Sequence, residues 1–239
     1  MKKLNTFLFD LDGTLLSINM KKFEEYYFHS LSHNFRDLMS PQDFVKLIWS
    51  STMDMVKNVE HKTNEEVFKS SLRNLVDDKF DLFEDRFTKY YDTDFVAVRE
   101  AVEETVEMVA AVKTLKSKGY NLAIATNPMF PKAAIYRRIE WAGLDLDDFS
   151  YITTFEENHY CKPQLQYYEE ILRDIKKSAE ECIMVGNDVL EDLVAKRLGI
   201  QTYLITDHML NRNNIEIVTD QMGTYKDVLT FVESLPSRP

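Results

Sequence analysis

The sequence predicts an α/β fold in which a doubly wound parallel sheet is interrupted, after its first strand, by an inserted all-helical domain. The first observation is a series of short apolar runs separated by helix-length segments, which is typical of parallel strands buried on both faces. The second is the span Thr14 to Lys118, which contains no glycine and a single proline, Pro41. We therefore expect a core domain of residues 1–15 and 93–239 and an inserted helical domain of residues 16–92.

Five apolar runs are the expected strands of the core domain. They are LNTFLF (4–9), LAIA (122–125), YITTF (151–155), CIMV (182–185) and TYLI (202–205). In the inserted segment, residues 16–92, apolar residues recur at helical spacing instead. Ser40 followed by Pro41 predicts the start of one of these helices, because proline is favoured in a first helical turn.

Composition limits the partners of the protein. Twenty-nine Lys and Arg against 40 Asp and Glu give the 239-residue chain a formal charge of −11, so we expect neither nucleic acid nor membrane as a partner. The N-terminal apolar stretch is broken by Asn5 and Asp10, which is unlike a signal peptide. Only two cysteines, Cys161 and Cys182, are present, too few for a disulfide framework. We therefore expect a cytoplasmic protein.

Polar residues follow the predicted strands. In open α/β sheets ligands bind beyond the carboxyl ends of the strands, so these residues are the candidates for a functional site. Each group alone also fits a purely structural role, such as a helix cap or a solvated loop residue. The candidates are Asp10, Leu11, Asp12, Gly13 and Thr14 after the first run, Thr126 and Asn127 after the second, Lys162 and Pro163 beyond the third, and Gly186, Asn187, Asp188, Glu191 and Asp192 after the fourth.

The candidates suit a phosphoryl group held beside a divalent cation. Asp10 and Asp12 lie two residues apart and repel each other unless a proton or a cation intervenes. The acidic segment 187–192 favours a cation. Because oxygen ligands are available without a nearby histidine, we expect Mg²⁺ before Ca²⁺ or Zn²⁺. A metal ion, a hydroxyl group and a lysine together form a plausible phosphoryl site.

The order of the four motifs resembles that of the haloacid dehalogenase-like (HAD) hydrolase superfamily. The motifs are an apolar strand ending in Asp-x-Asp-Gly-Thr, a second ending in Thr-Asn, a lone Lys-Pro, and a Gly-Asn-Asp acidic loop. Together they cover the core from Leu4 to Gly199. The insertion, between the first and second motifs, resembles the helical cap of the first type in that superfamily.

The resemblance implies a role for each matching residue. Asp10 would be the nucleophile that carries an aspartyl-phosphate, and Asp12 would be the general acid and base, its main-chain carbonyl ligating Mg²⁺. Thr126 and Lys162 would bind the non-bridging oxygens, helped by amides around Leu11 and Asn127. Positioning and charge neutralisation dominate phosphoryl transfer, so no organic cofactor is expected.

The fourth motif departs from the usual pattern of the superfamily, in which Asp directly follows Gly. Here Asn187 holds that position and Asp188 comes next. We predict Asp188 as the metal ligand, with Asp10 and the carbonyl of Asp12, because Mg²⁺ prefers charged oxygens. The alternative is an amide oxygen from Asn187. The second acid of the loop corresponds to Glu191 or Asp192, and the sequence leaves that choice open.

The predicted function is a Mg²⁺-dependent phosphatase that acts on a small phosphorylated metabolite. A phosphomutase would use the same residues and remains an alternative. A hydrolytic dehalogenase needs neither Asp12 nor the acidic loop, and a phospho-receiver module is about half as long; both are less favoured. We expect substrate specificity to lie in the cap and in the loop of residues 19–22.

Overall fold

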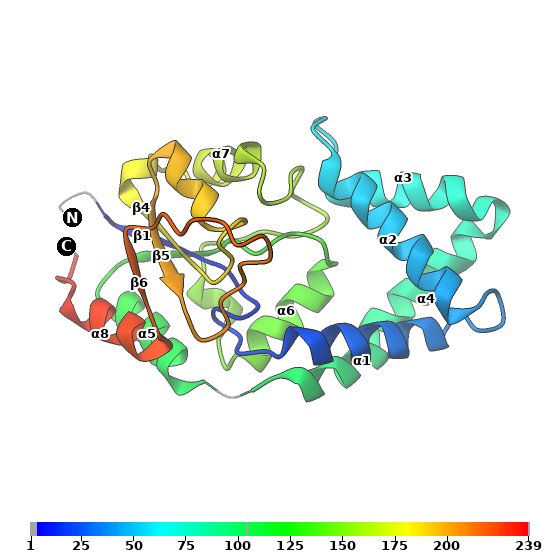
Figure 1. The fold of residues 1–239 in the computed structure, drawn as a ribbon, viewed down its shortest axis with the longest axis horizontal. Helices are drawn as coiled ribbons and strands as arrows, with labels where there is room; N and C mark the ends of the chain where they lie inside the picture. The colour runs from blue at the N-terminus through cyan, green and yellow to red at the C-terminus, as the bar shows by residue number, and fades with distance from the viewer. Residues whose placement is uncertain (1–3, 104, 239) are drawn as a thin grey trace.

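The computed structural model describes residues 4–103 and 105–238. Its centre is a parallel sheet with the strand order β3-β2-β1-β4-β5-β6 (Figure 1). The strands are β1 (Thr6–Phe9), β2 (Asn121–Ile124), β3 (Tyr151–Ile152), β4 (Cys182–Gly186), β5 (Gln201–Ile205) and β6 (Gln221–Gly223). The predicted α/β class with a doubly wound parallel sheet is confirmed.

Apart from shifts of one or two residues at other strand ends, the strands differ from the prediction in two respects. β3 ends at Ile152 rather than at residue 155, because Thr153 uses its hydroxyl to bond the main-chain oxygen of Thr126 (2.7 Å), and the amide of Thr154 bonds the side chain of Asn158 (2.7 Å). The prediction of five strands was also wrong, because β6 was missed. β6 is a three-residue edge strand whose Met222 side chain is half exposed, so it has no apolar run to reveal it.

Helices cover both faces of the sheet. Along β1, Phe7 and Phe9 pack in one apolar cluster and Leu8 in another, as the alternation of side chains in a strand requires. The first cluster contains residues of α5 (Val106–Ser117), α6 (Lys132–Trp141) and α8 (Tyr225–Ser234). The second contains residues of α7 (Leu165–Asp174) and the 3₁₀ helix η5 (Leu193–Leu198). Two further 3₁₀ turns are η3 (Leu146–Asp148) and η4 (Ala179–Glu181).

The segment between β1 and α5 is helical, and Figure 1 shows helices α1 to α4 beside the sheet, on the right. Its elements are α1 (Met20–His33), α2 (Pro41–Lys57), α3 (Asn64–Val76), η1 (Asp77–Lys79), α4 (Phe80–Asp92) and η2 (Asp94–Ala101). Pro41 begins α2 as predicted, and Ser40 accepts a hydrogen bond from the amide of Asp43 (3.2 Å). Stacked rings of Phe35 and Phe44, 4.5 Å apart, form part of its interior.

The topology directs a ligand to the carboxyl end of β1. The chain adds β2 and β3 on one side of β1 and β4, β5 and β6 on the other. Phe9, the last residue of β1, is in register with Ile124 of β2 and Val185 of β4. The loops after these three strands therefore meet at the switch point of the sheet, where ligands of doubly wound folds bind. Across the described ranges, we find no helix with the length and apolar character needed to span a membrane.

Candidate active site

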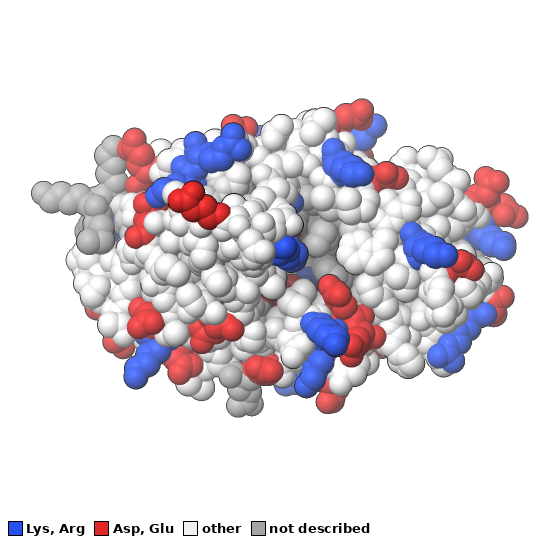
Figure 2. Space-filling model, viewed as in Figure 1, with Lys and Arg blue, Asp and Glu red and all other residues white. Residues whose placement is uncertain are grey.

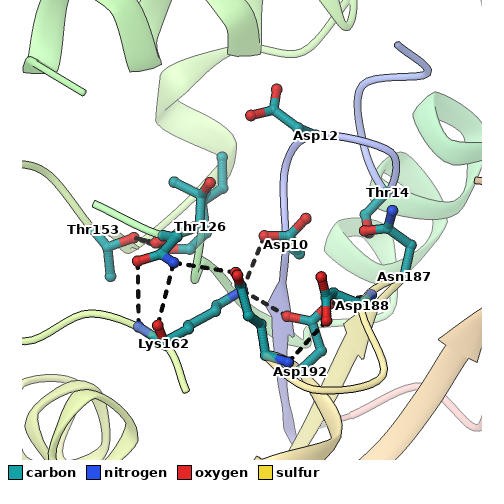
Figure 3. Close-up of polar contacts among 12 residues, drawn as sticks. Asp10, Asp12, Thr14, Thr126, Thr153, Lys162, Asn187, Asp188 and Asp192 are labelled. Atoms are coloured by element: carbon teal, nitrogen blue, oxygen red, sulfur yellow. Dashed lines mark hydrogen bonds and ion pairs between the residues drawn. The ribbon is translucent and has the colours of Figure 1, made fainter. Parts of the chain in front are cut away.

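Lys162 joins two carboxylates at the carboxyl edge of the sheet. Its Nζ donates to Oδ1 of Asp10 (2.9 Å) and to Oδ1 of Asp192 (2.6 Å), and its side chain is only 1% exposed. Figure 3 shows the three side chains pointing toward one another. Asp10 and Lys162 are 152 residues apart in the sequence, so the fold brings these two candidates into direct contact.

Burial dominates the electrostatics of this group. It raises the pKa of Asp10 and the pKa of Asp192, the latter to about 6, and the charge of Lys162 only partly opposes both shifts. Burial also opposes the charge on Lys162, yet the two aspartates raise its pKa well above the ordinary value. One buried cation is therefore shared by two carboxylates, and a proton or a second cation would neutralise the remaining negative charge.

Asp12 is paired with a residue that the sequence did not single out. Nη1 of Arg138, on α6, donates to Oδ2 of Asp12, and the guanidinium lies over the rings of Phe130 (4.7 Å) and Phe23 (5.8 Å). Figure 3 shows the carboxylate of Asp12 pointing away from Lys162. Oδ1 of Asp12 and Nη2 of Arg138 are buried without a hydrogen-bond partner among the described residues. Burial raises the pKa of Asp12, and Arg138 counteracts that shift.

Thr126 and Asn127 connect the loops of the site. The main-chain oxygen of Thr126 accepts hydrogen bonds from Thr153 (2.7 Å) and from the hydroxyl of Tyr167 (2.8 Å). Asn127 accepts from the amide of Lys162 (3.2 Å) and donates to Oε2 of Glu191 (3.1 Å). Neither residue caps α6, whose N-cap is Pro131. Asn127 instead links the loop that carries Lys162 to the acidic loop by hydrogen bonds to both.

In the acidic loop, the candidate ligands Asn187, Asp188 and Asp192 make different contacts. Asn187 accepts from the hydroxyl of Thr14 (3.2 Å) and donates to the main-chain oxygen of His208 (2.7 Å), so it ties neighbouring loops together. In Asp188, Oδ1 accepts from two main-chain amides of its own loop, and the buried Oδ2 accepts no hydrogen bond, although Nη1 of Arg212 lies 2.9 Å away. Asp192 contacts Lys162.

Two glycines allow this close approach. A Cβ atom on Gly13 would lie 2.3 Å from Nδ2 of Asn187, and the φ of Gly13, +79°, is itself unfavourable for other residues. A Cβ atom on Gly186 would lie 2.1 Å from Oδ2 of Asp192. Both glycines are therefore required for the packing of the acidic loop against the end of β1.

The predicted Mg²⁺ ligands fit a cation that keeps several waters. In residues 4–103 and 105–238, no cluster of three His, Cys, Asp or Glu side chains is arranged to hold a metal by itself. The predicted set needs only two carboxylates, Asp10 and Asp188, with the carbonyl of Asp12. The buried Oδ2 of Asp188, which accepts no hydrogen bond but forms an ion pair with Arg212 (2.9 Å), is the atom that such a cation would contact, since Mg²⁺ typically takes one or two carboxylates and completes its octahedron with water.

The fold and these strand-end residues define a hydrolase with a parallel sheet and a helical insertion. The chain belongs to the haloacid dehalogenase-like hydrolase family, whose profile matches residues 4–199. It is 24% identical over 214 residues to the pyrophosphatase PpaX of Bacillus cereus (strain Q1), covering 90% of this chain and 88% of that protein.

Solved structures show the same fold. A predicted phosphoglycolate phosphatase from Haemophilus somnus 129pt matches with a TM-score of 0.60 and 18% identity over 97% of this chain and 99% of that one. The putative HAD-hydrolase YfnB from Bacillus subtilis, bound to magnesium, matches with a TM-score of 0.58 and 17% identity over 97% and 99% of the two chains. The profile match over residues 4–199 confirms the predicted superfamily, and these structures confirm its fold.

Proposed function

We propose that this hydrolase is a Mg²⁺-dependent phosphatase that cleaves a small phosphorylated metabolite through an aspartyl-phosphate on Asp10. The observation that carries the proposal is the contact of Lys162 with Asp10, because it places a buried cation beside the nucleophile, where the oxygens of a phosphoryl group would lie. The names of the pyrophosphatase relative and of the magnesium-bound structural neighbour support phosphate chemistry and the metal.

In the first half of the reaction, Asp10 attacks phosphorus in line. Oδ1 of Asp10 is held by Lys162, and none of the hydrogen bonds between described residues uses Oδ2, so Oδ2 is the attacking atom. The bond from phosphorus to the leaving oxygen breaks, and Asp12 gives its proton to that oxygen. Lys162 and the hydroxyl of Thr126 bind the non-bridging oxygens, and amides near Leu11 and Asn127 add to this binding.

In the second half, Asp12 takes a proton from water, the resulting hydroxide attacks phosphorus, and the bond to Asp10 breaks. The raised pKa of Asp12 suits both directions of proton transfer. Asp10, Asp188 and the carbonyl of Asp12 would hold the Mg²⁺, which supplies charge neutralisation to the phosphoryl group when bound. Attack on carbon, as in dehalogenation, would still use the carboxylate of Asp10 as nucleophile, but it would require neither Asp12 as an acid nor Asp188 as a metal ligand.

Release of inorganic phosphate from a panel of phosphate esters, with and without Mg²⁺, tests this function. We expect release that depends on Mg²⁺ and is lost in Asp10→Asn. Absence of release from every ester would contradict the proposal. A product that retains its phosphoryl group at a new position would favour the phosphomutase alternative. A cytoplasmic location remains a prediction.

A further inference from the structure

A pocket of about 350 Å³ lies between the helical insertion and the loops that follow β2 and β3. Figure 2 shows that this face of the molecule is hollowed between the two parts. Its volume is in the range of small-molecule sites. Much of the lining is aromatic and comes from both parts: Phe23, Tyr27, Phe28, Trp49, Phe68 and Phe130.

The pocket begins beside the proposed acid. Phe23 and Phe130 line it, and the same two rings pack on the guanidinium of Arg138, which donates to Asp12. Asp12 must lie within hydrogen-bond reach of the leaving oxygen in order to protonate it. The leaving group of a substrate therefore departs on the side of Asp12, which is the side of the pocket.

The charged lining disfavours a second anion. Five acidic residues contribute to it, Glu24, Glu65, Glu84, Asp92 and Glu156, against one basic residue, Lys69. Lys69 is already paired with Glu65 (2.8 Å) and Glu84 (2.5 Å). A phosphate or carboxylate in the pocket would need Arg, Lys or amide donors, and it would meet acidic side chains and aromatic rings instead.

We propose that this pocket binds the alcohol part of the substrate, and that the substrate is a phosphate monoester of an apolar alcohol, with an alkyl or aryl group, rather than pyrophosphate or an ester with a second anionic group. This inference rests on the proposed phosphatase activity. Burial of apolar groups against the rings supplies the binding energy, and the acidic lining repels competing dianions. This substrate class differs from the one in the name of the Bacillus cereus relative.

An n-alkyl phosphate series tests the inference. With Mg²⁺, kcat/KM should rise about fourfold for each methylene from ethyl to hexyl phosphate, the factor expected for burying one CH₂ group. Inorganic pyrophosphate and phosphoglycolate should be poorer substrates than hexyl phosphate. If ethyl phosphate is hydrolysed but chain length has no effect, or if pyrophosphate is preferred, the inference is wrong and the phosphatase function stands.

If no ester is cleaved, measurements of ligand binding distinguish a failure of the proposed pocket from a failure of the proposed phosphatase function. Calorimetry with n-hexylphosphonate and methylphosphonate reports on the pocket without turnover. Tighter binding of the hexyl compound, by about tenfold or more, supports the pocket even if the phosphatase function fails. Equal binding of the two compounds overturns the inference.

Charge reversal offers a matched pair of variants. Both Glu24 and Glu25, adjacent residues on α1, are exposed, but only Glu24 lines the pocket. Glu24→Lys should raise kcat/KM for pyrophosphate relative to hexyl phosphate, and Glu25→Lys should leave that ratio unchanged. Equal effects of the two variants would mean that only the overall charge matters, and would contradict the proposal.

A second pair of variants tests the aromatic lining of the pocket. Trp49→Ala should lower the ratio of kcat/KM for hexyl phosphate to that for ethyl phosphate by about tenfold, the scale expected for about 50 Å² of lost apolar contact. Met53→Ala, on the same helix, changes an exposed side chain outside the lining and should keep the ratio. An unchanged ratio in Trp49→Ala would contradict the proposed position of the alkyl chain.

Discussion

Arg138 on α6 donates from Nη1 to Oδ2 of Asp12, and both side chains retain a buried polar atom without a hydrogen-bond partner among the described residues. The pair is flanked by Phe130 and Phe23, which belong to the two walls of the pocket. Arg138 thus fixes the side chain that is proposed to transfer protons, and it does so at the boundary between the phosphoryl site and the pocket.

The first prediction concerns this pair. Asp12→Asn should lower kcat by about a hundredfold to ten-thousandfold, the usual contribution of a general acid and base. Arg138→Lys should lower kcat by a smaller factor, because lysine keeps the charge but loses the planar guanidinium that contacts the rings. Steady-state kinetics with one ester measures both. If Asp12→Asn retains full activity, another group transfers the proton.

The second prediction concerns Lys162. Lys162→Met should weaken the binding of orthophosphate or vanadate as well as turnover, because it removes the buried cation next to Asp10. Lys113→Met, which changes an exposed lysine on α5, is the control. Inhibition constants measure the binding. Unaltered inhibition in Lys162→Met would assign this lysine a purely structural role.

The third prediction concerns the metal ligand. Asp188→Ala should raise the Mg²⁺ concentration needed for half-maximal activity far more than Asn187→Ala, because it removes an anionic oxygen. The side-chain amide of Asn187 already forms hydrogen bonds with Thr14 and His208. Titration of activity with Mg²⁺ distinguishes the two variants, and a larger rise in Asn187→Ala would assign the ligand to Asn187 instead.

The fourth prediction concerns acid stability. Glu181 accepts hydrogen bonds from the amide (2.9 Å) and hydroxyl (3.0 Å) of Ser178 and from Asn5 (2.8 Å), which precedes β1. The amide of Ser178 and then the side chain of Asn5 lower the pKa of Glu181 from 4.5 to about 2. The unfolded chain therefore binds this proton first as pH falls, so the stabilisation is complete above pH 4.5 and is lost toward pH 2.

Urea unfolding of the wild type and of Glu181→Gln at several pH values checks this sign. The difference between their midpoints should be constant above pH 4.5 and should shrink below it. A difference that does not change with pH would show that the carboxylate is not the source of the stabilisation.

The sequence was sufficient to predict five of the six strands and the convergence of the motif residues, because apolar runs and strand-end positions depend on local pattern. Asp10 and Lys162 meet as expected from the topology. Arg138 could not be found, because an arginine in an amphipathic helix usually lies on the solvated face, and only tertiary packing buries it. The choice between Glu191 and Asp192 likewise depended on the path of the loop, which places Asp192 against Lys162 and Glu191 against Asn127.

The central claim is that Asp10 carries the phosphoryl group. Asp12→Asn, incubated with Mg²⁺ and a radiolabelled aryl phosphate whose phenoxide can leave without a proton, and then quenched in acid, should retain label, because the first half no longer needs the acid and hydrolysis of the aspartyl-phosphate slows when its base is missing. Peptide mass spectrometry should place the phosphoryl group on Asp10, and the double variant Asp10→Asn/Asp12→Asn should retain none. Turnover without covalent label, or label that persists in the double variant, would contradict the account.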